Sequence, residues 1–512
     1  MISIRGALTS KIDRLDPRYL SLVKASEKLA EKNSELWGAS AAVEAGIRLN
    51  WIDLPITSRT LLPELDALAA RFRSQTKVIL CGMGGSSLAP EVIAATYGKE
   101  LVVLDSTDPN YLRHATSGDL SQTVVVVSSK SGSTLETASQ RALFEDLFSK
   151  ANLSATEHMV IVTDPGSPLD QDARARNFIV VSADPKVGGR FSALSAFGLV
   201  PAALIGVDIS LLLDSAADAL PGMLGEESAA IEMAYLLAYH CGQYCAFSDF
   251  ESGMPGLSNW IEQLIAESTG KDKVGRLPIV IESNMAQVAG ESVRIAFAGF
   301  SDLVVDAPLG AQFIFWEWVT ALLGFALQID PFNQPNVTEA KEKTAALLAT
   351  WGAAIPNFEP DFVDGSVEIF GVKNSLQATL LQVIDSVGSD GYLAIMAYLD
   401  RRDDFALGEL RRVMASRSGR PVTFGWGPRF LHSTGQFHKG GQQNGTFLQI
   451  TGECSNDLKI PNREFTFATL IAAQALGDGE ALASRGFSVI RLHLRQRSRG
   501  IAQILSAARE II

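Results

Sequence analysis

Five short runs of apolar, mostly β-branched residues recur between positions 78 and 181, each separated from the next by a stretch long enough for a helix. Within the runs apolar and polar residues do not alternate, so both faces of the strands are expected to be buried. Buried strands that alternate with helices are typical of βαβ units in a parallel sheet. The sequence therefore predicts the α/β class. The runs are VILC (78–81), LVVL (101–104), TVVVV (123–127), MVIV (159–162) and FIVV (178–181).

The chain of 512 residues is too long for one ordinary core, and its patterns divide it into four parts. Residues 1–70 show helical periodicity, and residues 70–210 hold the five runs as a first α/β module. The runs LPIVI and DLVVD, followed by a long apolar helix, predict a second α/β module over 211–345. Residues 346–512 mix strand and helix patterns again, so a C-terminal α/β extension is expected.

Composition excludes several classes of protein. An apolar fraction of 47% with 20% charged residues describes a folded chain, and a net charge of −13 argues against a nucleic-acid binder. Six histidines and four cysteines lack the spacing of metal ligands, which argues against a metal enzyme. No uninterrupted apolar run reaches the ~18 residues that span a bilayer, and no secretory signal is visible. We expect a cytoplasmic protein that has no cofactor and that binds neither nucleic acid nor membranes.

Three segments follow predicted strands, at the sheet edge where open α/β proteins bind ligands. In CGMGGSSLAP (81–90), glycines let the backbone approach a ligand, although a tight structural turn is an equal alternative. In SSKSGSTLET (128–137), hydroxyls, a lysine and a helix start suit a monophosphate better than a triphosphate. In VGGRFS (187–192), backbone N–H groups and a fixed positive charge can point to one place, unless the arginine is a surface charge.

Two segments further along the chain offer a base and a cation. In WIEQLIAESTGK (260–271), Gln263 and Glu267 share one face of a helix that Gly270 is expected to end. Glu267 suits a general base there, and a surface pair with Lys271 is the alternative. In PFNQPNVTEAKEKT (331–344), a helix start would place Lys341 on the first or second turn, as a ligand contact or as a surface lysine.

Histidines are concentrated in RFLHSTGQFHKGG (429–441), which carries His432 and His438 between glycines. Six residues apart, the two imidazoles cannot share a helix face, whereas strand spacing would put both on one side. A buried structural histidine is the alternative.

Taken together and in this order, the segments resemble the phosphoglucose isomerase family. GGSS resembles the family's Gly-Gly-Ser turn, SSKSGSTLET its phosphate loop and VGGRFS its Gly-Gly-Arg signature, while ESTGK and FNQPNVTEAK resemble the segments with the catalytic glutamate and the Gln…Lys pair. LWG, SSKSGST, LHSTGQFHKGG and FLQIT are most similar to the isomerase half of transaldolase–isomerase fusion proteins. Because no room remains for a ~250-residue transaldolase barrel, we expect the isomerase half alone.

The resemblance implies two sugar-isomerase modules, a homodimer with shared active sites and a sugar-phosphate substrate. The reaction it implies interconverts glucose 6-phosphate and fructose 6-phosphate through a cis-enediol, without a metal. Glu267 would move the proton between C2 and C1, Arg190 with the backbone of Gly189 would stabilise the enediolate, and Lys341 would assist ring opening. The other residues that would bind substrate are Gly85, Ser86, Ser129, Lys130, Ser131, Thr134, Gln263 and Gln334.

One position departs from the family pattern. The ring-opening histidine of the family usually lies between the glutamate and Gln…Lys segments, and this chain has no histidine between Glu267 and Lys341. His432, in a similar H-x-x-x-Q setting, is therefore assigned to ring opening, with His438 as second candidate. Two other functions stay open, an isomerase of another C6-anionic hexose such as mannose 6-phosphate and a non-catalytic sugar-phosphate sensor. The sensor is disfavoured because the base is present and no basic DNA-binding domain is visible.

Overall fold

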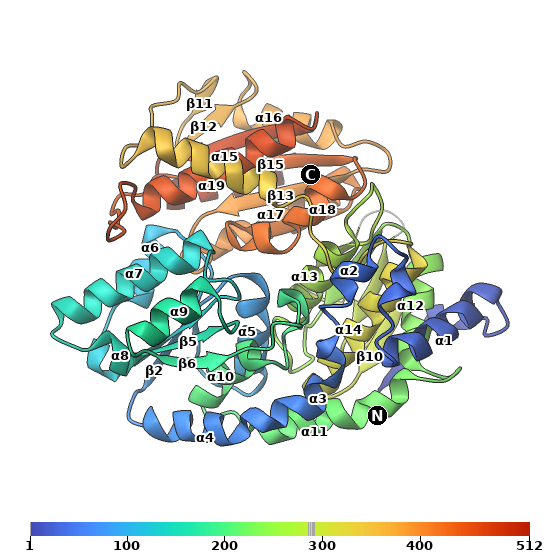
Figure 1. Ribbon diagram of the computed structural model, residues 1–512. Helices are drawn as coiled ribbons and strands as arrows, with labels where there is room; N and C mark the ends of the chain where they lie inside the picture. Colours follow the sequence, from blue (N-terminus) through green and yellow to red (C-terminus); the bar gives the residue numbers. More distant parts are fainter. Residues whose placement is uncertain (1, 285, 287, 289–291, 512) are drawn as a thin grey trace.

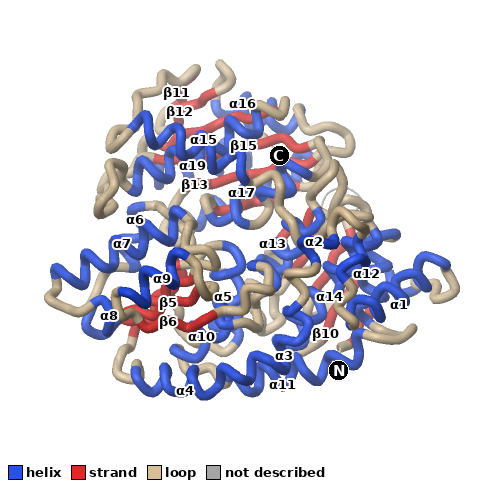
Figure 2. Tube along the Cα trace, viewed as in Figure 1, coloured by secondary structure: helices blue, strands red, loops and turns tan. Residues whose placement is uncertain are grey.

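Three sheets, each flanked by helices, make up the protein (Figure 1; Figure 2). The computed structural model describes residues 2–284, 286, 288 and 292–511. In the view of Figure 1 the first and second sheets lie side by side below, and the third, in orange and red, lies above them. The predicted α/β class with parallel sheets and flanking helices is confirmed.

The first sheet is parallel throughout and has the order β3-β2-β4-β5-β6. Its central strand β4, TVVVVS, is buried at every position, as expected for β-branched residues covered on both faces. All five predicted runs form its strands, within one or two residues. The strands are β2 (Lys77–Cys81), β3 (Val102–Leu104), β4 (Thr123–Ser128), β5 (Met159–Thr163) and β6 (Ile179–Ser182).

The second sheet has the order β1-β10-β9-β7-β8 and collects strands that are far apart in the chain. Four of its strands are parallel, and the N-terminal strand β1 pairs antiparallel with β10 at the edge. Residues 1–70, expected as helices, thus also contribute a strand to this sheet. The strands are β1 (Ser3–Arg5), β7 (Tyr244–Ser248), β8 (Leu277–Val280), β9 (Val293–Ala296) and β10 (Leu303–Asp306).

The third sheet, of order β11-β12-β16-β15-β13-β14, lies wholly within residues 362–494. Strands β14, β13, β15 and β16 are parallel, and β12 and β11 continue the sheet antiparallel. The strands are β11 (Phe362–Asp364), β12 (Val367–Phe370), β13 (Tyr392–Tyr398), β14 (Val422–Trp426), β15 (Gly445–Gly452) and β16 (Ser488–Leu494).

Helices fill the remainder of the architecture. The N-terminal ones are α1 (Pro17–Ala30), α2 (Ala42–Ala45), α3 (Leu54–Thr57) and α4 (Leu62–Arg71). Those between β2 and α14 are α5 (Leu88–Thr96), α6 (Pro109–Ala115), α7 (Leu135–Lys150), α8 (Ala155–His158), α9 (Pro168–Ala175), α10 (Ala196–Leu204), α11 (Ile209–Ala219), α12 (Ala229–Tyr239) and α13 (Leu257–Thr269). The rest are α14 (Leu309–Ala326), α15 (Thr338–Trp351), α16 (Leu376–Asp385), α17 (Glu409–Ser418), α18 (Gly435–Gly440), α19 (Phe467–Ala483) and α20 (Arg497–Glu510).

Helix α14 is long and apolar enough to cross a membrane by length and composition, although Gln312, Glu317 and Thr320 interrupt its apolar run. It is nevertheless 89% buried inside the protein, where α11, α12 and α13 pack against it. Its apolar character on all sides is therefore that of a core helix.

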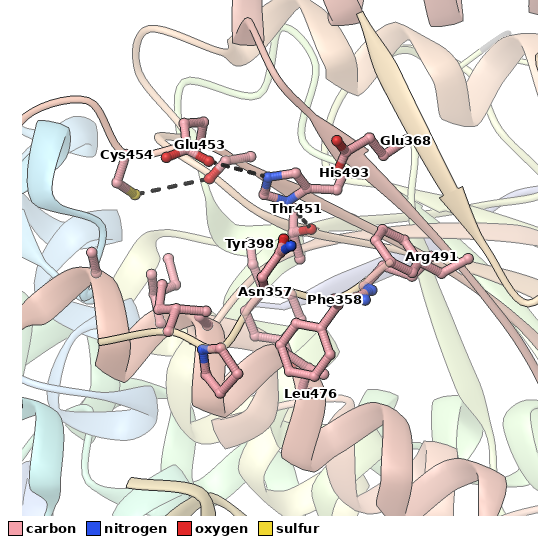
Figure 3. Close-up of a pocket in the computed structure, with 17 residues that line it drawn as sticks. Asn357, Phe358, Glu368, Tyr398, Thr451, Glu453, Cys454, Leu476, Arg491 and His493 are labelled. Carbon is pink, nitrogen blue, oxygen red and sulfur yellow. Dashed lines mark hydrogen bonds and ion pairs between the residues drawn. The ribbon is translucent and has the colours of Figure 1, made fainter. Parts of the chain in front are cut away.

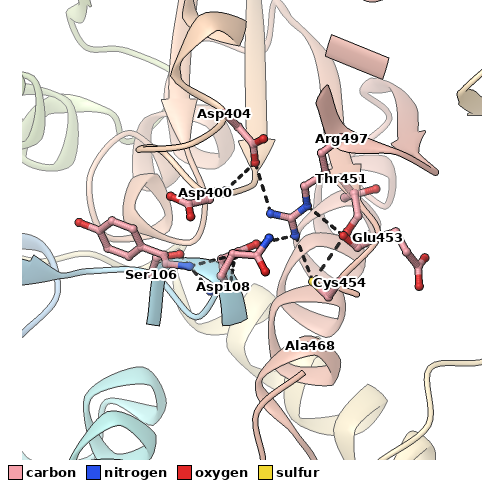
Figure 4. A network of polar contacts seen from close by, with 12 residues as sticks. Ser106, Asp108, Asp400, Asp404, Thr451, Glu453, Cys454, Ala468 and Arg497 are labelled. Atoms are coloured by element: carbon pink, nitrogen blue, oxygen red, sulfur yellow. Dashed lines mark hydrogen bonds and ion pairs between the residues drawn. The ribbon is translucent and has the colours of Figure 1, made fainter. Parts of the chain in front are cut away.

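Ion pairs fasten the third sheet to the first (Figure 4). The guanidinium of Arg497, at the start of α20, lies 2.7 Å from Asp108, the residue that caps α6. The same guanidinium lies 3.3 Å from Asp404 and donates to the carbonyl of Glu453 at 2.9 Å. Arg401 and Arg429 add pairs with Glu91 of α5. These contacts join parts of the chain that are far apart in the sequence.

Candidate functional site

A cavity of about 1160 Å³ lies where the first sheet's carboxyl ends meet α13, the start of α15 and the histidine segment. Every residue predicted from the sequence to act on substrate lines it. These are Gly85, Ser86, Ser129, Lys130, Ser131, Thr134, Gly189, Arg190, Gln263, Glu267, Gln334, Lys341 and His432. The structure therefore brings together side chains that are up to 347 positions apart in the sequence.

Two glycine turns meet at the floor of the cavity. They form the short 3-10 helices η5 (Gly84–Ser86) and η7 (Gly189–Phe191), which are packed against each other. A Cβ atom on Gly85 would lie 1.9 Å from the carbonyl oxygen of Gly189, so no larger residue fits there. A structural need for Gly85 thus coexists with its position on the cavity wall.

The Ser/Thr loop after β4 presents its hydroxyls to the same space. Ser129 Oγ accepts from the backbone N–H of Gly132 at 3.1 Å and lies 3.4 Å from Thr134 Oγ1, at the N-cap of α7. Ser131 is exposed, as expected for a group that a ligand would reach. Backbone N–H groups at the start of α7 and these hydroxyls make a concave set of donors, suited to an anion.

Lys130 differs from a free cation, because its ammonium already has partners. Its Nζ lies 2.5 Å from Asp164 Oδ2 and donates to the carbonyl of Pro185 at 3.0 Å. Burial raises the pKa of Asp164, although the nearby lysine lowers it. The loop therefore places beside its hydroxyls a lysine whose charge is already paired with Asp164. The sequence did not indicate this ion pair.

Arg190 and Glu267 form a buried ion pair at the back of the cavity. Arg190 Nη1 lies 3.2 Å from Glu267 Oε1. The guanidinium also donates to Ser268 Oγ at 2.7 Å, to the Pro331 carbonyl at 2.6 Å and to the Asn333 carbonyl at 3.1 Å. Burial lowers the pKa of Arg190, and the charge of Glu267 offsets part of that effect. The arginine is thus held rigidly beside the carboxylate.

Glu267 lies in the last turn of α13, which ends before Gly270 as the sequence predicts. Gln263, one turn earlier, donates to Glu267 Oε2 at 3.2 Å and to the carbonyl of His432 at 2.8 Å. The alternative of a surface pair between Glu267 and Lys271 is wrong. Both side chains are buried, and Lys271 Nζ donates to the carbonyls of Asp330 and Asn333.

His432 belongs to a polar chain that reaches into the core of the protein. Its Nε2 lies 2.9 Å from Glu136 Oε1, and Gln474 of α19 donates to the same oxygen at 2.8 Å. Burial raises the pKa of Glu136, but the imidazole and the N–H groups around the carboxyl outweigh burial and leave it lowered. An ionised carboxylate only accepts hydrogen bonds, so Nε2 of His432 donates to Glu136 Oε1.

His438 occupies a different environment from His432. It lies in α18 rather than in a strand, buried, with Nδ1 2.9 Å from the hydroxyl of Tyr392. Burial lowers its pKa to about 3, so the imidazole is neutral. It does not line the cavity. The strand geometry that would have placed both histidines on one face is not formed, because His432 ends the 3-10 helix η10 (Arg429–His432).

Gln334 and Lys341 close the other side. Gln334 Oε1 accepts from Arg190 Nη1 at 3.4 Å, and Lys341 lies on the first turn of α15, as predicted. The charge of Lys341 contributes to the lowered pKa of Glu136. Among the residues that the structure describes, no group of three or more His, Cys, Asp or Glu side chains is arranged to hold a metal ion.

Two residues at this site were not singled out from the sequence. Glu136 lies within SSKSGSTLET, and its place in the first turn of the helix after the loop was an available signal. Gln474 belongs to no recognisable sequence motif. It reaches the site only because the fold brings α19 close enough for Gln474 to donate to Glu136.

Comparison with known proteins identifies similar sequences. Residues 66–292 match the family model described as phosphoglucose isomerase. A probable glucose-6-phosphate isomerase of Haloquadratum walsbyi is 32% identical over 284 residues, which cover 54% of this chain and 63% of that protein. A glucose-6-phosphate isomerase of Thermus thermophilus is 34% identical over 283 residues, 51% of this chain and 66% of that protein. The chain thus spans somewhat less than two thirds of these relatives' lengths.

The fold is shared with a solved structure as well. A crystal structure of a glucose-6-phosphate isomerase from Chlamydia trachomatis superposes with a TM-score of 0.54 at 19% identity, over 68% of this chain and 88% of that one. The family match contains the glycine turns, the Ser/Thr loop and Glu267, whereas Gln334, Lys341 and His432 lie beyond it. The likeness to the isomerase half of fusion proteins stays a prediction. Over its residues 66–292, this chain is similar to the phosphoglucose isomerase family.

Proposed function

We propose that the protein is an aldose–ketose isomerase that interconverts glucose 6-phosphate and fructose 6-phosphate. The observation that carries the proposal is the convergence of a base, a buried cation, a phosphate-type loop and an oriented imidazole on one cavity. The match of residues 66–292 to the phosphoglucose isomerase family model supports the same reaction class.

Glu267 is the base that moves the proton between C2 and C1 in this proposal. Its two oxygens are held by Arg190 and Gln263, at 3.2 Å each, so the carboxylate has a fixed orientation. Proton transfer needs such a group within hydrogen-bond reach of the carbon-bound proton. The negative charge that develops on the enediolate oxygens would be met by Arg190, whose position needs no reorganisation during the reaction.

His432 and Lys341 open the sugar ring before that step. Ring opening takes a proton from the anomeric hydroxyl and gives one to the ring oxygen. The carboxylate of Glu136 accepts from Nε2 of His432, so Nδ1 is the nitrogen that would accept a proton. Lys341, on the same cavity wall, supplies a donor for the ring oxygen.

The phosphate is bound by the hydroxyls of Ser129, Ser131 and Thr134 with the backbone at the start of α7, beside Gly85 and Ser86. Charge-assisted hydrogen bonds to a dianion are the strong ones, so this loop would supply most of the binding. Lys130 would contribute after exchanging part of its contact with Asp164 for the phosphate.

A homodimer remains part of the proposal. The family resemblance implies a homodimer with active sites shared between subunits. Light scattering on the purified protein measures the oligomeric state directly.

The test is a coupled assay that measures glucose 6-phosphate formed from fructose 6-phosphate, with and without EDTA. We expect turnover that EDTA does not change. Two further compounds separate the alternative functions. Mannose 6-phosphate is tested as a second substrate, and 6-phosphogluconate is tested as a ligand in a binding assay. Turnover of mannose 6-phosphate alone would indicate another hexose, and binding of sugar phosphates without any turnover would indicate a sensor.

A further inference from the structure

A second cavity, of about 370 Å³, lies on the opposite side of α19, against one face of the third sheet (Figure 3). Its wall consists of β12, β16 and the end of β15, its other side of α19, and its rim of the loop 355–358 that follows α15. No described residue lines both this cavity and the first one. The volume is that of a small-molecule site.

Arg491 is the main polar feature of this cavity. It lies on β16 opposite Phe370 of β12, and its guanidinium carbon is 3.9 Å from the centre of that ring and 5.7 Å from that of Phe358. Figure 3 shows the guanidinium beside Phe358 at the cavity wall. Within the described part of the chain, Arg491 has no carboxylate within ion-pair distance and no hydrogen-bond acceptor. Burial lowers the pKa of Arg491, and the charge of Glu368 offsets part of that effect.

Because Arg491 has no acceptor among the described residues, its guanidinium can donate hydrogen bonds to a bound ligand. The guanidinium has five N–H donors, and stacking on aromatic rings uses none of them. Its planar fork matches a carboxylate by two parallel hydrogen bonds. Other arginines that fasten the third sheet, such as Arg497 and Arg411, already have carboxylate partners.

The remaining lining defines what else the ligand carries. Phe358, Ile471 and Leu476 supply apolar surface, and the hydroxyl of Tyr398 is directed to Asp478. His493 is bound to Thr451 Oγ1 at 2.9 Å and, like Arg491, faces the cavity. The body of the ligand is therefore planar or apolar, with room for one polar substituent.

Charge limits the anion to a single negative charge. Two carboxylates, Glu368 and Glu453, also line the cavity; Glu368 lies 3.6 Å from Arg495, and Glu453 lies 3.5 Å from His493. Burial lowers the pKa of His493, so its imidazole is neutral at physiological pH. A phosphate dianion would bring two negative charges to one arginine and two nearby carboxylates, whereas a monocarboxylate brings only one, which the arginine can balance.

We propose that this cavity is a second ligand site, which binds a small organic monocarboxylate with its carboxylate on Arg491 and its planar body between Phe358 and α19. The site is independent of the isomerase proposal, because it shares no lining residue with the first cavity.

The test compares benzoate with phenyl phosphate, which have the same ring and different anionic groups, by isothermal titration or ligand-detected NMR. We expect saturable binding of benzoate at one site per chain and weaker binding of phenyl phosphate. Arg491→Met should weaken benzoate binding by about tenfold or more, since it removes two charge-assisted hydrogen bonds. Ala472→Leu, at a half-buried position of α19 on the cavity wall, fills the cavity without altering charge and should abolish binding.

Arg412→Met is the matched control, because Arg412 is an exposed arginine of the same sheet region outside the cavity. It should bind benzoate as the wild type does. Unchanged binding by Ala472→Leu would overturn the proposal even if Arg491→Met failed to fold. So would displacement of benzoate by fructose 6-phosphate, tighter binding of phenyl phosphate, or no saturable binding up to about 10 mM, beyond which affinity is weaker than that of specific sites.

Discussion

Replacing Arg190 by lysine keeps the charge of the site and removes its geometry. In the wild type the guanidinium reaches Ser268, Pro331, Asn333 and Glu267 from three nitrogen atoms. A lysine has one nitrogen on a shorter reach, so at least two of these contacts are lost. Hydrogen bonds of charged groups contribute about 1.5–3 kcal/mol each. The loss of two should therefore lower the free energy of unfolding by at least about 3 kcal/mol.

The catalytic effect of Arg190→Lys follows from the same geometry. A donor that no longer lies where the enediolate charge develops costs about 10²–10³-fold in kcat, the range found for removal of one oxyanion-type donor. KM should change much less, because the phosphate loop is untouched. The assay is steady-state turnover of fructose 6-phosphate together with urea unfolding of the same preparation. Arg59→Lys, at an exposed pair with Asp214, is the control and should leave both unchanged.

A folded Arg190→Lys variant with wild-type kcat would refute this reasoning. It would mean that the positive charge alone is sufficient and that the network around the guanidinium serves only packing.

The phosphate loop, the two histidines and a buried carboxyl beside the site each give a further prediction. Replacing Ser129 and Thr134 by alanine should raise KM for fructose 6-phosphate at least tenfold and leave kcat within a few-fold; an unchanged KM would make the loop structural. His432→Ala should impair turnover of the cyclic sugar phosphate while an enediolate-like hydroxamate still binds, whereas His438→Ala should lower the melting temperature instead; the reverse pattern would move ring opening to His438. Burial raises the pKa of Glu262 to about 8 from an ordinary 4.5, so the folded state holds a proton that the unfolded chain has lost, and stability should fall as pH rises from about 4.5 to about 8. Glu262→Gln should flatten that slope in denaturant titrations, and an unchanged slope would contradict the assignment.

The strands of the first sheet could be predicted because burial on both faces demands uninterrupted apolar runs, as in β4. Strands β7 and β9 were not predicted, since YCAFS and VRIA are short and carry polar or charged residues. The edge strand β11 and its neighbour β12 were missed for the same reason, because their partly exposed faces admit Asp364 and Glu368.

The histidine segment shows where local pattern fails. HSTGQFHKGG has strand-like spacing of its imidazoles, yet tertiary contacts turn it into η10 and α18, with Phe437 packed against Gly270 and Gly275. The position of three motifs at the ends of parallel strands predicted that they share one edge of the sheet, and the family resemblance added Glu267, Lys341 and His432 to the same site. The chain Gln474–Glu136–His432 was not predictable, since its members are separated by 296 and 338 positions and meet only through the third sheet's docking.

The measurement that tests the central claim most directly is the turnover of Glu267→Gln in the coupled assay. Glutamine keeps the shape of the side chain and its contacts with Arg190 and Gln263 but cannot accept the C2 proton. We predict that kcat falls by about 10²-fold or more while fructose 6-phosphate still binds with near-normal affinity. A variant that isomerises fructose 6-phosphate at close to the wild-type rate would contradict the assignment of Glu267 as the base, and with it the mechanism proposed for this cavity.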